Sequence, residues 1–168
     1  GATGAGKSTI INLINRFYEI DSGSICVDAI SVEDYNLQSL RNQVAIVLQD
    51  VFLFSDSIFN NITLKNESIT LEEVIKAAKQ IGIHDFVMTL PGGYQYNVKE
   101  RGAMLSSGQR QLIAFLRAYV SKPSILILDE ATSSLDSHAE QMIQYATETI
   151  TKDRTSIVIA HRLATIKQ

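Results

Sequence analysis

The sequence contains one cysteine, two prolines and no long apolar run, and each shortage narrows the class of protein. A single cysteine, Cys26, excludes an internal disulfide, and the apolar residues around it predict a small buried side chain in a reducing compartment. No stretch approaches the roughly 18 consecutive apolar residues that a membrane-spanning helix needs. We recognise no signal peptide, internal repeat or low-complexity tract. With 45% hydrophobic and 20% charged residues, the composition is typical of a soluble globular domain.

The charge balance is slightly acidic. With 15 Lys and Arg against 18 Asp and Glu, the formal net charge is −3 at pH 7. This balance argues against a nucleic-acid partner, since such surfaces are usually basic. At 168 residues, 45% of them hydrophobic, the chain has the size and composition of one domain with a substantial core.

The most specific pattern stands at the first residues. Gly1–Ser8 reads G-A-T-G-A-G-K-S and fits the phosphate-binding loop G-x-x-x-x-G-K-[ST]. Glycine lets the backbone N–H groups converge on phosphates, Lys7 reaches the β- and γ-phosphates, and the Ser8 hydroxyl ligates Mg²⁺. Such a loop normally follows a buried strand, which would precede Gly1. We therefore expect the chain to begin inside a domain and to be poorly stable alone.

Apolar periodicity predicts the remaining elements. Ile10, Leu13, Ile14 and Phe17 share one face of a helix after the loop, and Thr70 with Glu73 forms a capping box on another. Further helices are expected at 106–119 and 139–150, and strands at 24–27, 43–48, 125–128 and 155–160. Strands that alternate with helices predict an α/β fold with a mainly parallel sheet. The helical stretch 51–119 is expected to be a subdomain inserted between core segments 1–50 and 120–168.

Two further sequence segments contain residues suited to metal binding, catalysis or anion binding. The apolar run Ile125–Leu128 ends in Asp129 and Glu130, where one carboxylate can hold Mg²⁺ through its water shell and the other can polarise an attacking water. The string Leu105–Gln109 places small residues before a helix, where backbone N–H groups bind anions. Taken alone, the segment is better explained as an ordinary helix cap with Ser106 or Ser107 as the N-cap residue.

Leu105–Gln109 resembles the LSGGQ signature of ABC ATPases. The order of motifs also matches that family: the phosphate loop, Gln49, the signature, Asp129-Glu130, Ser134–Asp136 and His161. The resemblance implies a P-loop NTPase (RecA-like) fold, with helices on both faces of a mainly parallel sheet and an inserted helical subdomain. By the same resemblance, strands at the N- and C-terminal ends of the domain are missing.

The resemblance assigns roles to individual residues, with ATP and Mg²⁺ as cofactors. Glu130 is the implied general base, Gln49 approaches the metal and the water, and His161 contacts the γ-phosphate. The remaining implied ligands of the nucleotide are Gly1, Gly4, Ala5, Gly6, Lys7, Ser8 and Thr9, and those of the metal are Ser8, Gln49 and Asp129. Ser106, Gly108, Gln109 and Asp136 are implied to close over ATP that is bound to a second copy of the domain.

One signature position departs from the pattern, because Ser107 replaces the first glycine. We expect function to survive this change, since serine is small and both Ser106 and Gly108 are retained. His84 and His138 match no functional position and are expected at the surface or at helix starts. Asn61 and Asn66 begin glycosylation-like triplets, which we interpret as chance matches.

The segments around Leu48–Ile62 and Val98–Gly102 resemble those of exporters with fused membrane domains. The resemblance implies a place at the cytoplasmic face of a cell membrane, taken as the bacterial inner membrane. Glu100 is the implied contact with the membrane domain, and a solvated pair of Glu100 and Arg101 is the alternative. The transported substrate, the residue that stacks on adenine, and the choice between homodimer and heterodimer are not determined by the sequence.

Two other classes fit less well. ABC ATPases of chromosome maintenance or DNA repair insert a long coiled coil between the Gln loop and the signature. Only 56 positions separate Gln49 from Leu105 (105 − 49), and they contain no heptad pattern. A regulatory module with an inactive site would lack its lysine or its base, whereas Lys7 and Glu130 are both present.

Overall fold

The structure is a computed structural model that describes residues 6–130, 137–152 and 154–160 of the chain. The helices are α1 (Lys7–Ile14), α2 (Leu37–Gln43), α3 (Ile58–Thr63), α4 (Leu71–Gln80), α5 (His84–Thr89), α6 (Ser107–Val120) and α7 (Ser137–Ile150). The strands are β1 (Cys26–Val27), β2 (Ile30–Ser31), β3 (Val44–Val47), β4 (Ile125–Glu130) and β5 (Thr155–Ala160). The described residues also form short 3₁₀ helices, η1 (Val32–Asp34) between β2 and α2, and η2 (Gly93–Gln95) and η3 (Glu100–Gly102) between α5 and α6. None of the described helices is long and apolar enough to cross a bilayer.

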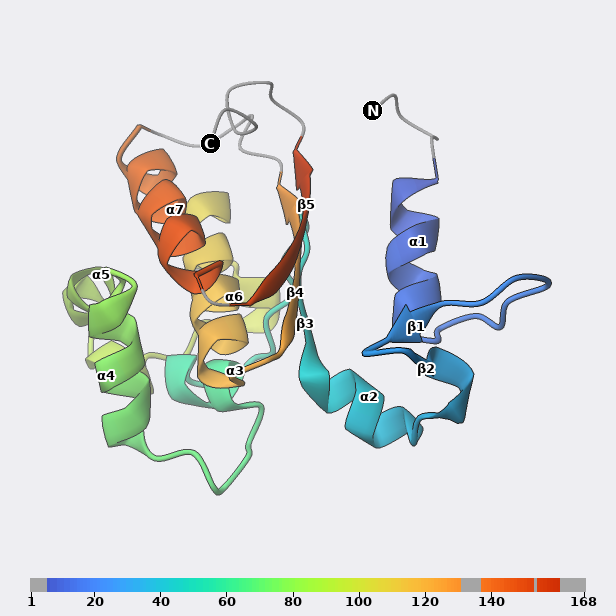
Figure 1. Cartoon of the computed structure of the whole chain (residues 1–168). Coiled ribbons are helices and arrows are strands. Elements are labelled where there is room, and N and C mark those ends of the chain that lie inside the picture. Colours follow the sequence, from blue (N-terminus) through green and yellow to red (C-terminus); the bar gives the residue numbers. More distant parts are fainter. Residues whose placement is uncertain (1–5, 131–136, 153, 161–168) are drawn as a thin grey trace.

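A parallel three-stranded sheet of order β3-β4-β5 forms the centre, with α1 on one face and α6 and α7 on the other (Figure 1). Alternation along β4 explains this arrangement, because successive side chains point to opposite faces. Ile127 packs with Ile11 of α1, whereas Leu126 and Leu128 pack in the cluster that contains α6 and α7. The predicted α/β class with a parallel sheet and helices on both faces is confirmed.

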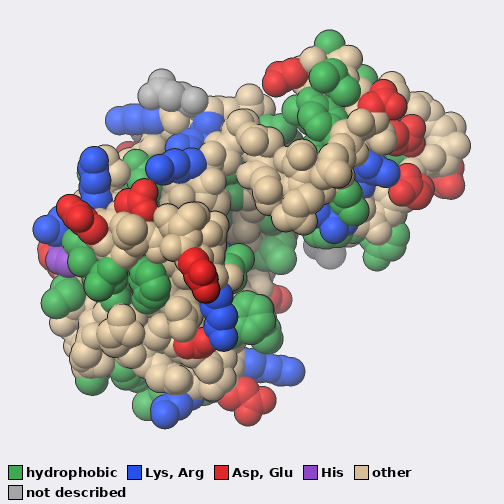
Figure 2. All heavy atoms as spheres, turned by 90° about the horizontal axis from the view of Figure 1, so that it is seen from below, with side chains coloured by type: hydrophobic (Ala, Val, Ile, Leu, Met, Phe, Trp, Pro, Cys, Tyr) green, Lys and Arg blue, Asp and Glu red, His purple; other side chains and the backbone are tan. Residues whose placement is uncertain are grey.

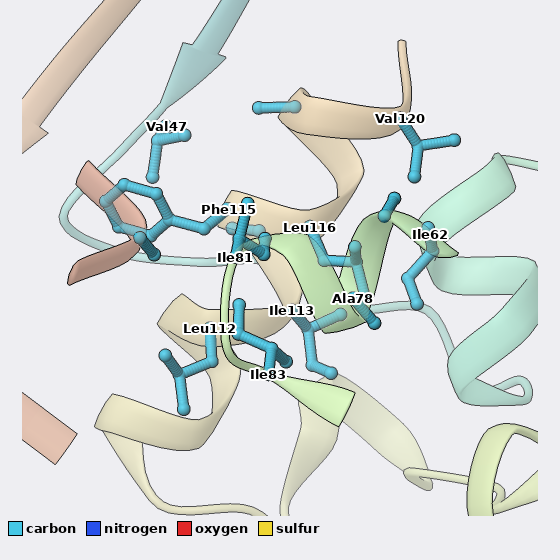
Figure 3. Packing of buried hydrophobic residues seen from close by; sticks show 14 of the residues in the cluster. Val47, Ile62, Ala78, Ile81, Ile83, Leu112, Ile113, Phe115, Leu116 and Val120 are labelled. Atoms are coloured by element: carbon cyan, nitrogen blue, oxygen red, sulfur yellow. The ribbon is translucent and has the colours of Figure 1, made fainter. Parts of the chain in front are cut away.

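The larger core surrounds α6. Leu112, Ile113, Phe115 and Leu116 are at most 1% exposed, and Figure 3 shows them amid buried side chains of other elements. Val47 of β3 and Ile62, Ala78, Ile81 and Ile83 of the helical region are among these neighbours. Burial of each large aliphatic side chain contributes about 1.5–3 kcal/mol. One core therefore joins the sheet to the helices that follow β3.

The face predicted for α1 is confirmed at Ile14, which packs against the sheet, and wrong at Ile10 and Phe17. Ile10 is 56% exposed and Phe17 is 53% exposed, whereas Ile11 is 3% exposed. The helix ends at Ile14, so Phe17 lies beyond it and meets the guanidinium of Arg41 at 5.0 Å instead. Within the helix, Ile11 is the most buried contact with the sheet, and Ile14 packs beside it.

The prediction for Cys26 is also wrong, since this residue is exposed. It lies in β1, a two-residue strand that pairs only with β2 in a hairpin, so no sheet face covers it. Other local predictions are confirmed: Thr70 and Glu73 form a capping box, and Ser106 caps α6. His84 begins α5, where its Nδ1 lies 2.9 Å from the Tyr94 hydroxyl, and His138 is exposed in the first turn of α7.

Asp56 holds the turn before α3 through hydrogen bonds, and its ionisation makes the stability of the fold depend on pH. Its carboxylate accepts hydrogen bonds from Asn60 Nδ2 (2.8 Å) and Ser57 N (2.7 Å) and lies 3.1 Å from Lys65 Nζ. These bonds, that from Asn60 first, lower the pKa of Asp56 to about 2. A lowered pKa stabilises the fold above the unfolded value near 3.8, and this contribution disappears as the pH falls toward 2.

We therefore expect Asp56→Asn to flatten the loss of stability between pH 4 and pH 2. Denaturant unfolding at several pH values measures this slope for the parent and the variant. Asp34→Asn is the control, because Asp34 is exposed. An unchanged slope in Asp56→Asn would show that this carboxylate does not stabilise the fold through its ionised form.

Candidate functional site

The candidate catalytic residues meet where the parallel strands end. Val47 pairs with Leu128, and Glu130 pairs with Ala160, so the carboxyl ends of β3, β4 and β5 share one edge. Gln49 lies two residues after β3, and Asp129 and Glu130 are the last residues of β4. In α/β proteins this edge is the usual place for a ligand. The register thus brings Gln49, Asp129 and Glu130 to one edge of the sheet.

The N-terminal end of α1 faces the same edge (Figure 1). Gly6 precedes the helix at φ +79°, a backbone conformation that glycine adopts without strain, and the space at its Cα is open. No side chain of a described residue caps the first turn, and the turn contains no acidic residue. Backbone N–H groups at such a start, together with the helix dipole, favour an anion. Lys7 and Ser8 are the first residues of this helix.

Several predicted site residues lie outside the described residues. These are Gly1, Gly4, Ala5, Asp136 and His161, and the side chain of Glu130 is likewise not described. The backbone of Glu130 is placed in β4, and His161 directly follows Ala160, the last residue of β5. Their assigned roles remain predictions.

The signature turn is closed by reciprocal hydrogen bonds. Ser106 Oγ accepts from the Gln109 N–H at 3.2 Å, and Gln109 Oε1 accepts from the Ser106 N–H at 2.9 Å. Arg110 Nη1 donates to the Leu105 carbonyl at 2.7 Å. Ser106 and Ser107 stay exposed, whereas Gly108 is buried. These hydrogen bonds hold the turn in place, and its exposed residues Ser106 and Ser107 present small side chains to solvent.

The two helix starts that are predicted to bind phosphate lie on opposite faces of the sheet. The first turn of α1 stands over the face that carries Ile127, and α6 packs with Leu126 and Leu128 on the other face. Figure 1 shows the sheet between the two helices. Within one chain, Ser106 and the first turn of α1 are thus separated by the sheet.

The segment after Gln49 is held by a residue that sequence reasoning did not assign to the site. Asn61 is fully buried; its Oδ1 accepts from Phe54 N at 2.8 Å, and its Nδ2 donates to the carbonyls of Phe54 and Ser57 at 3.0 Å. Arg117 of α6 donates from Nε to the Asn61 carbonyl at 2.8 Å. Burial lowers the pKa of Arg117. Asn61 lies three positions after Ile58 and next to Ile62, so the signal in the sequence was an amide on the apolar face of α3.

Gly102 packs the predicted membrane-domain contact against the signature helix. At φ +68°, an added Cβ would lie 3.0 Å from both Arg110 Cδ and Leu53 Cδ1, so only glycine fits. Glu100 and Arg101 beside it are exposed. The segment 100–102, the residues after Gln49 and α6 therefore contact one another directly.

Comparison with known proteins identifies the family. The ABC transporter model matches residues 1–133. The chain belongs to the ABC transporter family. Proteins named for multidrug export ATP-binding/permease function in Bacillus subtilis (strain 168) and Staphylococcus aureus (strain NCTC 8325 / PS 47) are each 51% identical over 166 residues, which is 99% of this chain and 29% of theirs.

A solved structure gives the same assignment. A bacterial Atm1-family ABC exporter with ATP bound matches with a TM-score of 0.89 and 44% identity, over 99% of this chain and 29% of that one. The chain thus has the fold of the matched part of that exporter. It spans about three tenths of the length of the relatives it matches.

Proposed function

We propose that the chain is the ATP-hydrolysing domain of an exporter, and that it works by ATP-driven dimerisation with a second such domain. The observation that carries the proposal is the separation of the two phosphate-binding helix starts by the sheet. ATP seated on Gly1–Thr9 of one copy is then completed by Ser106, Gly108 and Gln109 of another, with Asp136 at the seam. Two copies can be identical or different.

Magnesium is the metal that the donor set fits. Ser8, Gln49 and Asp129 offer hydroxyl, amide and carboxylate oxygens, which are the ligands that Mg²⁺ takes together with phosphates and water. The ion supplies charge neutralisation at the phosphates. Its proposed place, the edge formed by β3 and β4, also faces the first turn of α1.

Hydrolysis then depends mainly on positioning and electrostatics. Lys7 and the first N–H groups of α1 hold the β- and γ-phosphates. Glu130 accepts the proton of the attacking water, while Gln49 and His161 orient that water. Loss of the γ-phosphate removes contacts that only the closed dimer makes, so the dimer opens.

The opening and closing are proposed to drive a membrane domain of the same transporter. The Gln49 loop and Glu100 carry this coupling, and their packing through Gly102 onto α6 supports it. Segments 1–50 and 120–168 are proposed as the nucleotide-binding core, with 51–119 as the helical subdomain. The whole works at the cytoplasmic face of a bacterial inner membrane, without a nucleic-acid partner.

The role of the signature is tested by comparing Ser106→Ala with Ser107→Gly. Ser106→Ala removes the cap of α6, so we expect ATP hydrolysis to fall about tenfold, corresponding to about 1.4 kcal/mol, while ATP binding to single domains is unchanged. Ser107 makes no cap, so its replacement should change the rate less than about threefold. If Ser106→Ala weakened ATP binding to single domains as much as hydrolysis, the signature would serve its own chain and the proposal would fail.

A further inference from the structure

The C-terminal end of α1 is closed by a turn that most often contains glycine. The Phe17 N–H donates to the Asn12 carbonyl at 2.9 Å, and the Arg16 N–H donates to the Leu13 carbonyl at 3.1 Å. This pair of bonds is the Schellman motif, in which the residue after the helix cap has a positive φ and is usually glycine. Here that residue is Arg16, at φ +49°. A side chain costs conformational energy in this position, which its own contacts must offset.

The Arg16 side chain attaches the segment between β2 and α2 to this end of α1. Its Nη1 is shared among three carbonyls, those of Val32 (3.3 Å), Glu33 (3.4 Å) and Tyr35 (3.2 Å). Asn36, the next residue, is the N-cap of α2. Glycine would relieve the turn but would release these carbonyls, because it has no donor to offer them. The arginine therefore links the end of α1 to the start of α2.

Arg41 of α2 contacts the same helix end from the other side. Its Nε donates to the Asn15 carbonyl at 3.2 Å, and its Nη2 donates to the Arg16 carbonyl at 3.0 Å. The same guanidinium lies over the Phe17 ring, 5.0 Å from the ring centre. The last turn of α1, Ile11–Ile14, contains no basic residue of its own. Arg41 thus supplies, from another helix, the hydrogen bonds and the positive charge that a helix C-terminus favours.

Helix α2 is itself fixed to the amino end of the sheet. Leu40 is fully buried. The Gln43 carbonyl accepts from the Ser124 N–H at 3.0 Å, and Gln43 Oε1 accepts from the Ser124 hydroxyl at 2.6 Å. The chain continues directly from α2 into β3, and Ser124 immediately precedes β4. Helix α2 is therefore tied to the two strands that lead to Gln49 and Asp129.

Apolar packing holds α1 on the sheet but does not fix the helix along its axis. The helix packs through Ile11 and Ile14, and such packing is non-directional. Seen from below, the side of the molecule that carries α1 forms a smaller lobe beside a larger one (Figures 1 and 2). Hydrogen bonds to carbonyls are directional, so contacts at the helix end can set the axial position that the apolar contacts leave free.

We infer that Arg41 is a positioning residue for ATP hydrolysis, which acts by holding α1 in line with the edge of the sheet. The inference rests on the proposed function and adds a residue at the opposite end of α1 from the nucleotide. Lys7 and Ser8 move with α1, whereas Gln49 and Glu130 move with the sheet. A shift of α1 leaves the phosphate-binding turn intact but moves the bound phosphates away from the residues that act on water. Small misplacements of this kind have large effects on rate.

The test compares Arg41→Ala with Arg41→Lys in the full-length exporter that contains this chain, in lipid nanodiscs. We expect Arg41→Ala to lower phosphate release at saturating Mg-ATP about 5- to 50-fold. The Kd for ATP measured in EDTA should change less than about twofold, because without metal the nucleotide depends on the turn that moves with α1. Arg41→Lys should recover part of the rate, since lysine keeps the charge but not the planar fork.

The control is Gln38→Ala, on the same helix. Gln38 is exposed, and its side chain bonds Asn42 within α2, so the rate should equal that of the parent. Hydrogen exchange reports on the helix itself: the amides of α1 should exchange faster in Arg41→Ala than in the parent, while those of α6 should not change. A general loss of stability would instead raise exchange in both helices.

Three results would each overturn the inference. A rate in Arg41→Ala within about twofold of the parent would show that alignment does not depend on Arg41. A Kd for ATP that rises as much as the rate falls would show that Arg41 supports binding. Exchange in α1 that is unchanged, or raised equally in α6, would show that Arg41 does not hold α1. In a parent that hydrolyses ATP, these results remove the further inference alone, whereas a parent that binds ATP without hydrolysing it refutes the proposed function and the inference with it.

Discussion

Replacing Glu130 by Gln is expected to lower the rate of ATP hydrolysis by about two to four orders of magnitude, the usual contribution of a general base. Glutamine keeps the size of the side chain but cannot accept the proton of the attacking water. The position supports this role, because Glu130 is the last residue of β4 and pairs with Ala160, next to His161. Phosphate release from Mg-ATP at saturating nucleotide measures the rate.

Glu148→Gln is the matched control, because it makes the same chemical change on the exposed side of α7. Its rate should equal that of the parent. ATP affinity should also be unchanged in Glu130→Gln, since this residue acts on water and not on the nucleotide. A variant that hydrolyses ATP at the parental rate would show that another group is the base.

Asn61→Leu is expected to destabilise the domain by about 2–4 kcal/mol. The substitution removes three side-chain hydrogen bonds and leaves the Phe54 N–H without a partner, whereas the carbonyls of Phe54 and Ser57 keep the backbone N–H groups of Asp56 and Asn61. Because this network fixes the segment after Gln49, we also expect a slower ATPase in the fraction that remains folded. Denaturant unfolding measures the first effect and phosphate release the second.

Asn60→Leu serves as the comparison one residue earlier. Asn60 is half-buried and its side chain donates a single hydrogen bond, to Asp56, so a loss of about 1 kcal/mol is expected. If both variants lost the same free energy of unfolding, the hydrogen bonds of Asn61 would contribute no more than the single bond of Asn60. Asn61 would then not be the residue that positions the segment after Gln49.

The sequence predicted those parts of the fold that depend on local patterns. Ile125–Leu128 is apolar at every position because β4 is the central strand of a sheet that is covered on both faces. The caps at Thr70 and Ser106 depend only on residues three apart, and both formed as expected. Asp129 and Glu130 could be assigned to the edge of the sheet because they directly follow the apolar run.

Tertiary contacts were not predictable from such patterns. Periodicity alone did not distinguish Ile10 from Ile11, because only the sheet determines which of them is covered. Asn61 resembled an exposed glycosylation triplet, yet the backbone of the Gln49 segment folds around its side chain. A cavity of about 980 Å³ beside β3 is lined by residues of α2, α4, α6 and the approach to β5, which no short sequence window contains together.

The central claim, that two chains complete each ATP site, is tested most directly by the molar mass of the Glu130→Gln ATPase domain in solution. Light scattering during size-exclusion chromatography should give a monomer without nucleotide and a dimer with Mg-ATP. Adding Ser106→Arg, which places a bulky cation at the signature turn, should abolish the dimer while each monomer still binds ATP. A domain that stays monomeric with ATP bound, or a dimer that tolerates Ser106→Arg, would contradict the account.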